Sequence, residues 1–539
     1  MSSLDATDVR LSRTAARMTI VAMGLGYTAA VVDPTILSAD ISAVRFGLGM
    51  TTSTASFTAS LATLTMAAAV LGAGTLGDVY GMRRMYLIGL VGTIAFGVLA
   101  AAAPTAAVLM VARAGTGVAL ASLLGLSLAI VNTVFAPERR TTVIAWYFGV
   151  GLAVAAPLPA IGGLAVAQMS WRAGLLVTPA LAAVALAITL RHVPQIPRAP
   201  RALDLAGLAL AAVALLALVF GIARLETGID VVAVTALCTG AVAAAGFVAW
   251  ELRTPQPALD LSIFRSGRFN AAAGAGLAFN FLTGGLMILF AFYLVTVRGE
   301  SPQVLGLLLI PATALAAVAA TTAGPAAARF GDRPVLVGGL AVMLAAVLLP
   351  RLFDENTSLA VVFVAVALTA VGGAMVATPQ ASIMMASAPA QLGGAVSGVK
   401  SAVNQAGYSL GPTVFALVGI NLILSEGTSK LSGSGITIEE ARESFRATHG
   451  GHAGGSHLLD PERARIVATA ATESMLDAIH VLSLVMAVVP VVAIVVTAVM
   501  IRPTPATGAK AHGRRAIRPA PARSGRPDPT GRPPGPDTR

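Results

Sequence analysis

The sequence predicts an all-α integral membrane protein, and three observations lead to this fold class. The 539 residues are 56% hydrophobic with a mean hydropathy of +0.82. Only 11% are charged, whereas soluble domains average about 25%. Apolar runs of about eighteen residues or more recur along the whole chain, and each is long enough to cross a bilayer as a helix.

Fourteen such runs are predicted to be transmembrane spans, with ends uncertain by a few residues. They lie at 18–41, 53–76, 85–103, 105–134, 141–167, 171–191, 203–223, 229–250, 269–297, 303–325, 335–350, 358–385, 395–424 and 476–501. We expect a short tail at 1–17, a six-helix bundle at 18–191 and two inserted helices at 203–250. A second six-helix bundle follows at 269–501, with an outer loop at 425–475, and the chain closes with a basic tail at 502–539.

Arginines in the short loops predict the orientation, because cytoplasmic loops carry the excess of basic residues. The pairs Arg83–Arg84, Arg139–Arg140 and Arg265–Arg268 fall on one side. The loops on the other side hold about one arginine each. We therefore expect a multi-pass protein of the cell membrane with both termini in the cytoplasm.

The two polar segments do not indicate a catalytic or metal-binding domain. Residues 502–539 are rich in Pro, Gly and Arg, which predicts disorder and attraction to anionic lipid rather than to nucleic acid. The outer loop holds His449, His452 and His457 among glycines, and a solvated linker is favoured over a metal site. The lone Cys238 rules out an internal disulfide. No metal and no cofactor are predicted.

Asp33 is the residue of greatest interest, since it is a carboxylate inside the first apolar run. A charge near the bilayer centre costs about 2.5–3.5 kcal/mol, so such residues usually face a bundle interior or a water path. Pro34 removes a backbone donor next to it. In the alternative interpretation the helix ends early and Asp33 lies among the outer headgroups.

The connection after the second span has a distinctive set of residues. Gly81 permits a tight turn, and Asp78 can pair with an arginine or lie against a helix N-terminus. The full set of loop residues is Gly74, Asp78, Gly81, Arg83 and Arg84.

This loop resembles the signature loop between helices 2 and 3 of the major facilitator superfamily. With fourteen spans, the chain is similar to the drug:proton antiporter branch, which implies two six-helix bundles plus two extra central helices. Asp33 and Pro34 resemble that branch's first-helix motif. Arg113, before Thr116 and Gly117, resembles its helix-4 motif, whose arginine is tied to proton coupling. Thr116 stands where Gln is usual.

The fifth span resembles the antiporter motif of the same branch. Leu158 departs from the motif, which has Gly at that position. The glycines and prolines could instead serve only close helix packing and a kink. The motif residues are Gly149, Gly151, Pro157, Pro159, Gly162 and Gly163.

Helical rise puts Asp33 and Arg113 at similar depths, each roughly 12 Å from the outer end of its own helix. We expect them to face one cavity and to pair directly or through water. A single acid in that cavity would suit cationic substrates. Candidate wall residues in the second half are Asn280, Phe281, Gln380, Asn404 and Tyr408.

The predicted function is proton-coupled export of small hydrophobic or amphipathic compounds by a monomer, with membrane lipid as its surroundings. Two alternatives are a lipid exporter or flippase of the same fold and, less favoured, a non-transporting sensor or scaffold. Gly407 to Gly411 fits the hydrolase pattern Gly-x-Ser-x-Gly but lies within an apolar span. With no Walker A sequence either, an enzyme is not expected.

Overall fold

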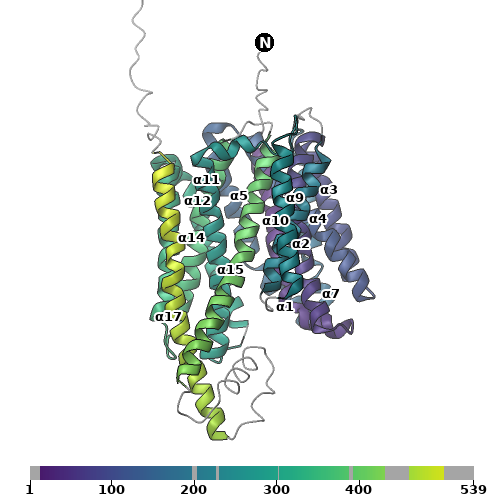
Figure 1. Ribbon diagram of the computed structural model, residues 1–539. Coiled ribbons are helices and arrows are strands. Elements are labelled where there is room, and N and C mark those ends of the chain that lie inside the picture. The colour runs from purple at the N-terminus through teal and green to yellow at the C-terminus, as the bar shows by residue number, and fades with distance from the viewer. Residues whose placement is uncertain are drawn as a thin grey trace, which may run out of the picture.

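A computed structural model describes residues 12–196, 203–225, 230–301, 303–387, 392–430 and 461–502. This part of the chain is helical and holds no strand (Figure 1). It contains fourteen helical segments that are long and apolar enough to cross a membrane. The prediction of an all-α membrane protein with fourteen spans is therefore confirmed. The histidines of the outer loop and the basic tail lie outside the described residues.

The first half of the chain forms eight α-helices and one short 3-10 helix. They are α1 (Arg13–Gly47), α2 (Thr52–Tyr80), α3 (Met82–Ala101), α4 (Ala106–Val134), η1 (Pro137–Arg139), α5 (Arg140–Ala155), α6 (Leu158–Gln168), α7 (Trp171–Gly174) and α8 (Val177–His192). The inserted pair is α9 (Leu205–Leu225) and α10 (Val231–Glu251).

The second half contains six long helices and three short turns of helix. They are η2 (Leu261–Arg265), α11 (Gly267–Phe292), η3 (Tyr293–Val297), α12 (Gln303–Phe330), α13 (Asp332–Leu348), η4 (Leu349–Leu352), α14 (Leu359–Ala386), α15 (Gly393–Lys430) and α17 (Pro461–Met500).

Proline and glycine explain where the long helices break or turn. The predicted fifth span is two helices, because Pro157 caps the start of α6 and cannot continue the hydrogen bonding of α5. Gly81 has a φ of 103° between α2 and α3, and Gly331 has a φ of 90° between α12 and α13. Both angles favour glycine, so the two halves use the same kind of tight connection.

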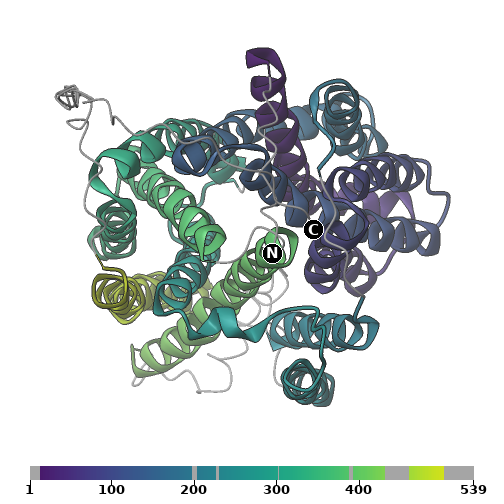
Figure 2. The same ribbon diagram turned by 90° about the horizontal axis from the view of Figure 1, so that it is seen from above.

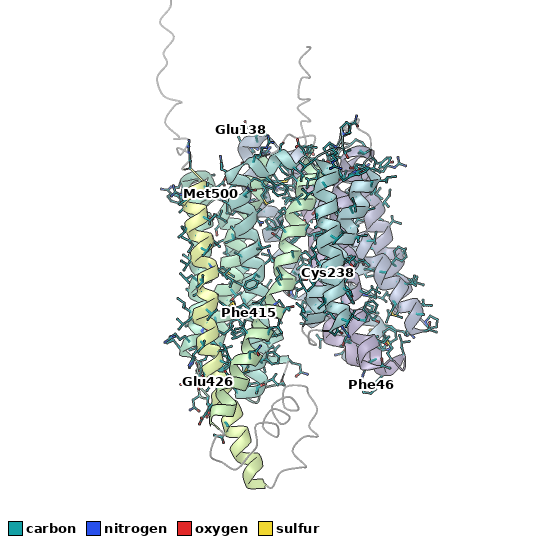
Figure 3. The ribbon with its side chains drawn as sticks, in the orientation of Figure 1. Phe46, Glu138, Cys238, Phe415, Glu426 and Met500 are labelled. Atoms are coloured by element: carbon teal, nitrogen blue, oxygen red, sulfur yellow. The ribbon has the colours of Figure 1, made fainter. Side chains whose placement is uncertain are left out.

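The bundle has two ends, which Figure 3 identifies by labelled residues. We call them the Glu138 end, where Met500 also lies, and the Phe46 end, where Glu426 lies. The helices α15 and α17 extend beyond the predicted spans at the Phe46 end. Part of the range predicted as an outer loop, 425–430 and 461–475, is therefore helical.

The hydrophobic cores show how the two halves pack. One core joins both halves near the Glu138 end, with Leu71 and Phe148 from the first and Ala320 and Val396 from the second. Toward the Phe46 end the cores are separate, one around Phe290 in the second half and others in the first. Figure 1 shows α1 and α15 diverging toward that end. The two bundles thus meet at the Glu138 end and separate toward the other.

The inserted helices lie at the edge of the assembly rather than between the bundles (Figure 2). Val219 of α9 packs with Leu64 and Ala67 of α2, and Thr413 of α15 donates to the carbonyl of Ile222 at 3.3 Å. Asp230 caps α10 and pairs with Arg224 at 3.0 Å, which closes the connection between α9 and α10. The helix α9 therefore spans the junction of the two bundles on one side.

Candidate functional site

Asp33 of α1 and Arg113 of α4 form a bidentate ion pair. Arg113 Nη1 donates to Asp33 Oδ1 at 3.1 Å, and Nη2 donates to Oδ2 at 2.6 Å. Arg113 is 1% exposed and Asp33 6%. The predicted direct contact is present. Because α1 continues from Asp33 to Gly47, the interpretation in which the helix ends near Asp33 is wrong.

Small residues on α4 hold Arg113 toward α1. A Cβ at Gly117 would overlap the carbonyl oxygen of Ala62, so only glycine allows α4 to pack this closely on α2. Thr65 of α2 donates to the carbonyl of Ala114 at 3.1 Å and fixes the rotation of α4. Because these contacts with α2 fix the rotation of α4 about its axis, the guanidinium of Arg113 faces Asp33 of α1.

Aromatic side chains of α1 and α5 form a cluster on the Glu138 side of this pair. The ring centroids of Tyr27 and Phe148 are 5.3 Å apart, and those of Tyr147 and Phe148 are 4.8 Å apart. Thr28 donates to the carbonyl of Gly151 at 2.8 Å and so ties α1 to α5. Tyr27 is half-buried, whereas Phe148 is buried.

Three glycines of the fifth-span motif face three different neighbours. Gly151 faces Tyr27 in the first bundle, whereas a Cβ at Gly149 would overlap Thr321 of α12 in the second. A Cβ added at Gly162 of α6 would lie 3.2 Å from Ile36. Pro157 caps α6, and Pro159 and Gly163 fall inside it. The predicted close packing is therefore present at Gly149 and Gly151, and Gly149 brings the two bundles together.

Asp78 lies at the N-terminus of a helix in the opposite bundle. Its Oδ1 accepts from the Gly394 N–H at 2.8 Å and its Oδ2 from the Ala395 N–H at 2.9 Å, where α15 begins. Asp78 is 2% exposed. A carboxylate there satisfies free backbone donors and the positive end of the helix dipole. Of the two alternatives for Asp78, the helix N-terminus is observed.

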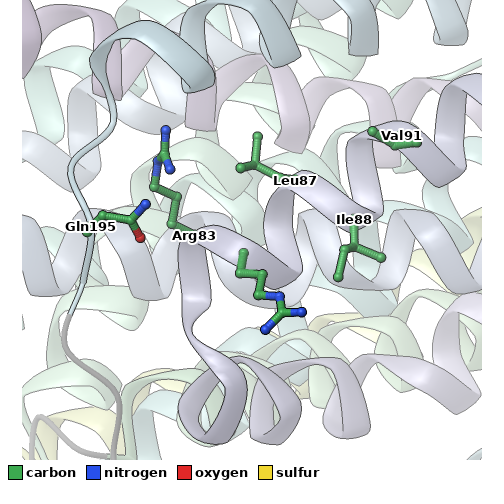
Figure 4. A pocket seen from close by; sticks show the side chains of 6 residues that line it. Arg83, Leu87, Ile88, Val91 and Gln195 are labelled. Atoms are coloured by element: carbon green, nitrogen blue, oxygen red, sulfur yellow. The ribbon is translucent and has the colours of Figure 1, made fainter.

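The two arginines of the same loop point away from that contact. Arg83 donates to the carbonyls of Thr189 and Leu190 at the end of α8. Figure 4 shows Arg83 in a surface pocket on α3 that Arg84 also lines. The other lining residues are Leu87, Ile88, Val91 and Gln195. Asp78 thus lies at the bundle junction, as does Gly74, where a Cβ would overlap the Gly394 carbonyl, whereas Arg83 and Arg84 lie on the outer face of the first bundle.

Asp78→Asn is expected to loosen the junction at the Glu138 end. Asparagine removes the charge and one of the two acceptors, which costs about 1–3 kcal/mol and shifts an opening equilibrium about 5- to 150-fold. Maleimide labelling of Ser397→Cys, a fully buried position on α15, should accelerate accordingly in a Cys238→Ala background. Asp260→Asn, at an exposed cap of η2, serves as the control. Equal labelling rates in both variants would exclude a latch at Asp78.

In the second bundle, three predicted wall residues lie together and two lie elsewhere. Gln380 Nε2 donates to Asn404 Oδ1 at 2.8 Å. Asn280 Nδ2 donates to the carbonyl of Gly276. Gly276 itself faces the side chains of Gln380 and Asn404. Phe281 instead packs on Phe415 with ring centroids 5.8 Å apart. Tyr408 is 43% exposed. The amide cluster therefore lies where α11, α14 and α15 meet.

Lys400 is a buried cation that the sequence analysis missed. It lies in α15 and is 6% exposed, and its Nζ is 4.9 Å from the centroid of the Phe148 ring across the bundle junction. Its presence in the predicted span 395–424 is the signal that could have identified it. A lysine inside a transmembrane helix is rare and usually functional.

Comparison with known proteins identifies the family. The Major Facilitator Superfamily model matches residues 18–412. The Multidrug resistance protein Stp of Mycobacterium tuberculosis is 32% identical over 413 residues, which cover 75% of each chain. The Tetracenomycin C resistance and export protein of Streptomyces glaucescens is 26% identical over 407 residues, which cover 74% of this chain and 75% of that one.

Solved structures agree on the fold. A double tryptophan mutant of XylE superposes with a TM-score of 0.58 at 13% identity, covering 92% of this chain and 97% of that one. The human organic anion transporter MFSD10 gives a TM-score of 0.53 at 16% identity over 87% of this chain and 98% of that one. The chain therefore belongs to the major facilitator superfamily and is a membrane transporter rather than an enzyme.

Proposed function

We propose that the protein is a proton-coupled antiporter that exports small amphipathic compounds across the cell membrane. The Glu138 end and both termini face the cytoplasm in this proposal, in keeping with the arginine-rich loops. The observation that carries it is the buried Arg113–Asp33 pair, since a carboxylate held inside a membrane bundle by one cation is suited to exchange a proton. The multidrug resistance names of the relatives support export as the direction.

Transport by alternating access needs two states, and the structure corresponds to one of them. The joint core, the Asp78 contacts and the Gly149 contact all lie toward the Glu138 end. We assign this arrangement to the outward-facing state, closed to the cytoplasm. The inward-facing state would require the Asp78 carboxylate to leave the N-terminus of α15.

Protonation of Asp33 would act as the switch between these states. A proton on the carboxylate removes the negative charge, while the guanidinium of Arg113 keeps its positive charge. The buried cation then lacks its counter-ion, and an arrangement that gives it water or another acceptor becomes favoured. Loss of the proton restores the pair. The substrate would bind between the bundles, near the aromatic cluster and the Gln380–Asn404 amides.

Proton-driven transport in reconstituted vesicles tests this function. A fluorescent amphipathic dye should accumulate in response to an imposed pH gradient with the native chain, and Asp33→Asn should abolish the response because asparagine cannot take up or release a proton. Asp230→Asn makes the same change at an exposed ion pair, and should leave the response intact. Undiminished gradient-driven accumulation by the Asp33 variant would remove that residue from the mechanism.

A further inference from the structure

Lys400 is a buried cation, and the described residues hold no carboxylate within ion-pair distance of it. By helical rise it lies roughly 10 Å inside α15, measured from Gly393. Among the described residues, the ammonium group contacts the face of the Phe148 ring. An aromatic face offsets only part of the cost of removing an ammonium group from water.

The surroundings of Lys400 connect it to the accessible side of α1. Tyr27, Val31 and Thr35 are spaced four residues apart on one face of that helix, and exposure rises from half-buried Tyr27 to exposed Val31 and Thr35. Tyr27 contacts Phe148, which contacts Lys400. Lys400 therefore lies at the inner end of this face, where the separated bundles come together.

The two nearby buried carboxylates, Asp33 and Asp78, are each bound by groups other than Lys400. Asp33 lies six residues beyond Tyr27, roughly 9 Å nearer the Phe46 end, and its charge is cancelled by Arg113 at 2.6 Å. Asp78 lies at the Glu138 end, where backbone amides of α15 bind it. Among the described residues, Lys400 is therefore a buried cation with no carboxylate at ion-pair distance. This buried cation weighs against the expectation that a single acid would favour cationic substrates.

We propose that Lys400 determines substrate charge, so that the transporter accepts amphipathic anions and neutral compounds and discriminates against permanent cations. The inference rests on the proposed function, since it specifies the charge of the compounds that the proposed transporter would carry. The rings of Tyr27 and Phe148 supply apolar surface for the body of the substrate. The ammonium group exchanges its weak contact with Phe148 for a charge-assisted contact with a carboxylate, sulfonate or phenolate.

A pair of hydrophobic ions with the same shape and opposite charge tests this assignment. Binding of tetraphenylborate and tetraphenylphosphonium to the purified full-length protein in detergent is measured by calorimetry. The native protein should prefer the anion at least about tenfold, the effect of one unpaired charge worth about 1.4 kcal/mol. Lys400→Met should bring the two affinities close together, and Lys400→Glu should reverse the order.

Two further variants separate charge from packing. Lys400→Arg keeps the charge and the ring contact and should keep the preference for the anion. Phe148→Leu removes the ring but leaves the ammonium, and should also keep it. A folded Lys400→Met protein with the native preference, a native protein that prefers the cation, or a native protein that binds neither ion would each overturn the assignment.

The vesicle experiment with Asp33→Asn distinguishes this failure from failure of the proposed function. If the gradient response is independent of Asp33 while charge preference follows Lys400, proton coupling through Asp33 is wrong and the charge assignment holds. If gradient-driven transport depends on Asp33 but charge preference ignores Lys400, only the assignment to Lys400 is wrong.

Discussion

Arg113→Met is expected to abolish transport and to lower the free energy of unfolding by about 3–5 kcal/mol. Methionine fills much of the same space but leaves the Asp33 carboxylate buried without its cation, and removing one partner of a buried pair carries this penalty. Unfolding by sodium dodecyl sulfate in mixed micelles measures the stability, and dye transport in vesicles measures the activity.

The double variant Asp33→Asn with Arg113→Met separates the structural cost from the functional one. Because both charges are gone, most of the lost stability should return, while transport should remain absent. Arg224→Met breaks an ion pair whose side chains are 41% and 40% exposed, so its effect on stability should be small. Gradient-driven transport by the double variant would show that the pair is structural only.

The sequence alone predicts the helices and the Asp33–Arg113 contact for one shared reason. Membrane thickness limits the length of an apolar helix, so the runs themselves count the spans. The same constraint gives depth, since each residue adds a fixed rise along its helix. Residues at equal depth on two helices of one bundle can then be paired, even though Asp33 and Arg113 are eighty positions apart in the chain.

Contacts between the bundles could not be predicted in this way. The Asp78 contact with Gly394 and the Lys400 contact with Phe148 depend on how two separate bundles dock. Hydropathy gives neither the rotation of a helix nor its partner, because lipid-facing and protein-facing positions are both apolar. For the same reason, wall residues chosen by polarity included Tyr408, which does not join the Gln380–Asn404 cluster.

Helix ends beyond the bilayer were also missed, and the reason is again physical. Residues 425–430 and 461–475 carry too many polar groups to be read as transmembrane. The helices α15 and α17 nevertheless continue into these ranges. Each extension adds backbone hydrogen bonds to an existing helix without a new nucleation cost. A hydropathy pattern detects the membrane-embedded part of a helix, not the whole of it.

Gly74→Leu is expected to drive the bundles apart at the Glu138 end and to reduce transport to background. A Cβ at Gly74 would overlap the carbonyl of Gly394, and a backbone atom cannot move aside as a side chain can. Asp78, one helical turn further along α2, would lose the Gly394 and Ala395 amides at the same time. The cost of about 1–3 kcal/mol or more shifts the two-state equilibrium at least about 5- to 150-fold toward the opposite state.

Spin labels at Phe46 and Leu352, which are 75% and 72% exposed on opposite bundles near the Phe46 end, measure this shift in a Cys238→Ala background. If the bundles rock as rigid bodies, opening at the Glu138 end must close the Phe46 end, so the distance between the labels should shorten in Gly74→Leu. Gly72→Leu adds the same side chain two residues away, where nothing lies within 4 Å, and should keep the native distance and transport. Unchanged distances in both variants would mean that this glycine contact does not hold the bundles in the observed state, and the latch would then rest on Asp78 alone.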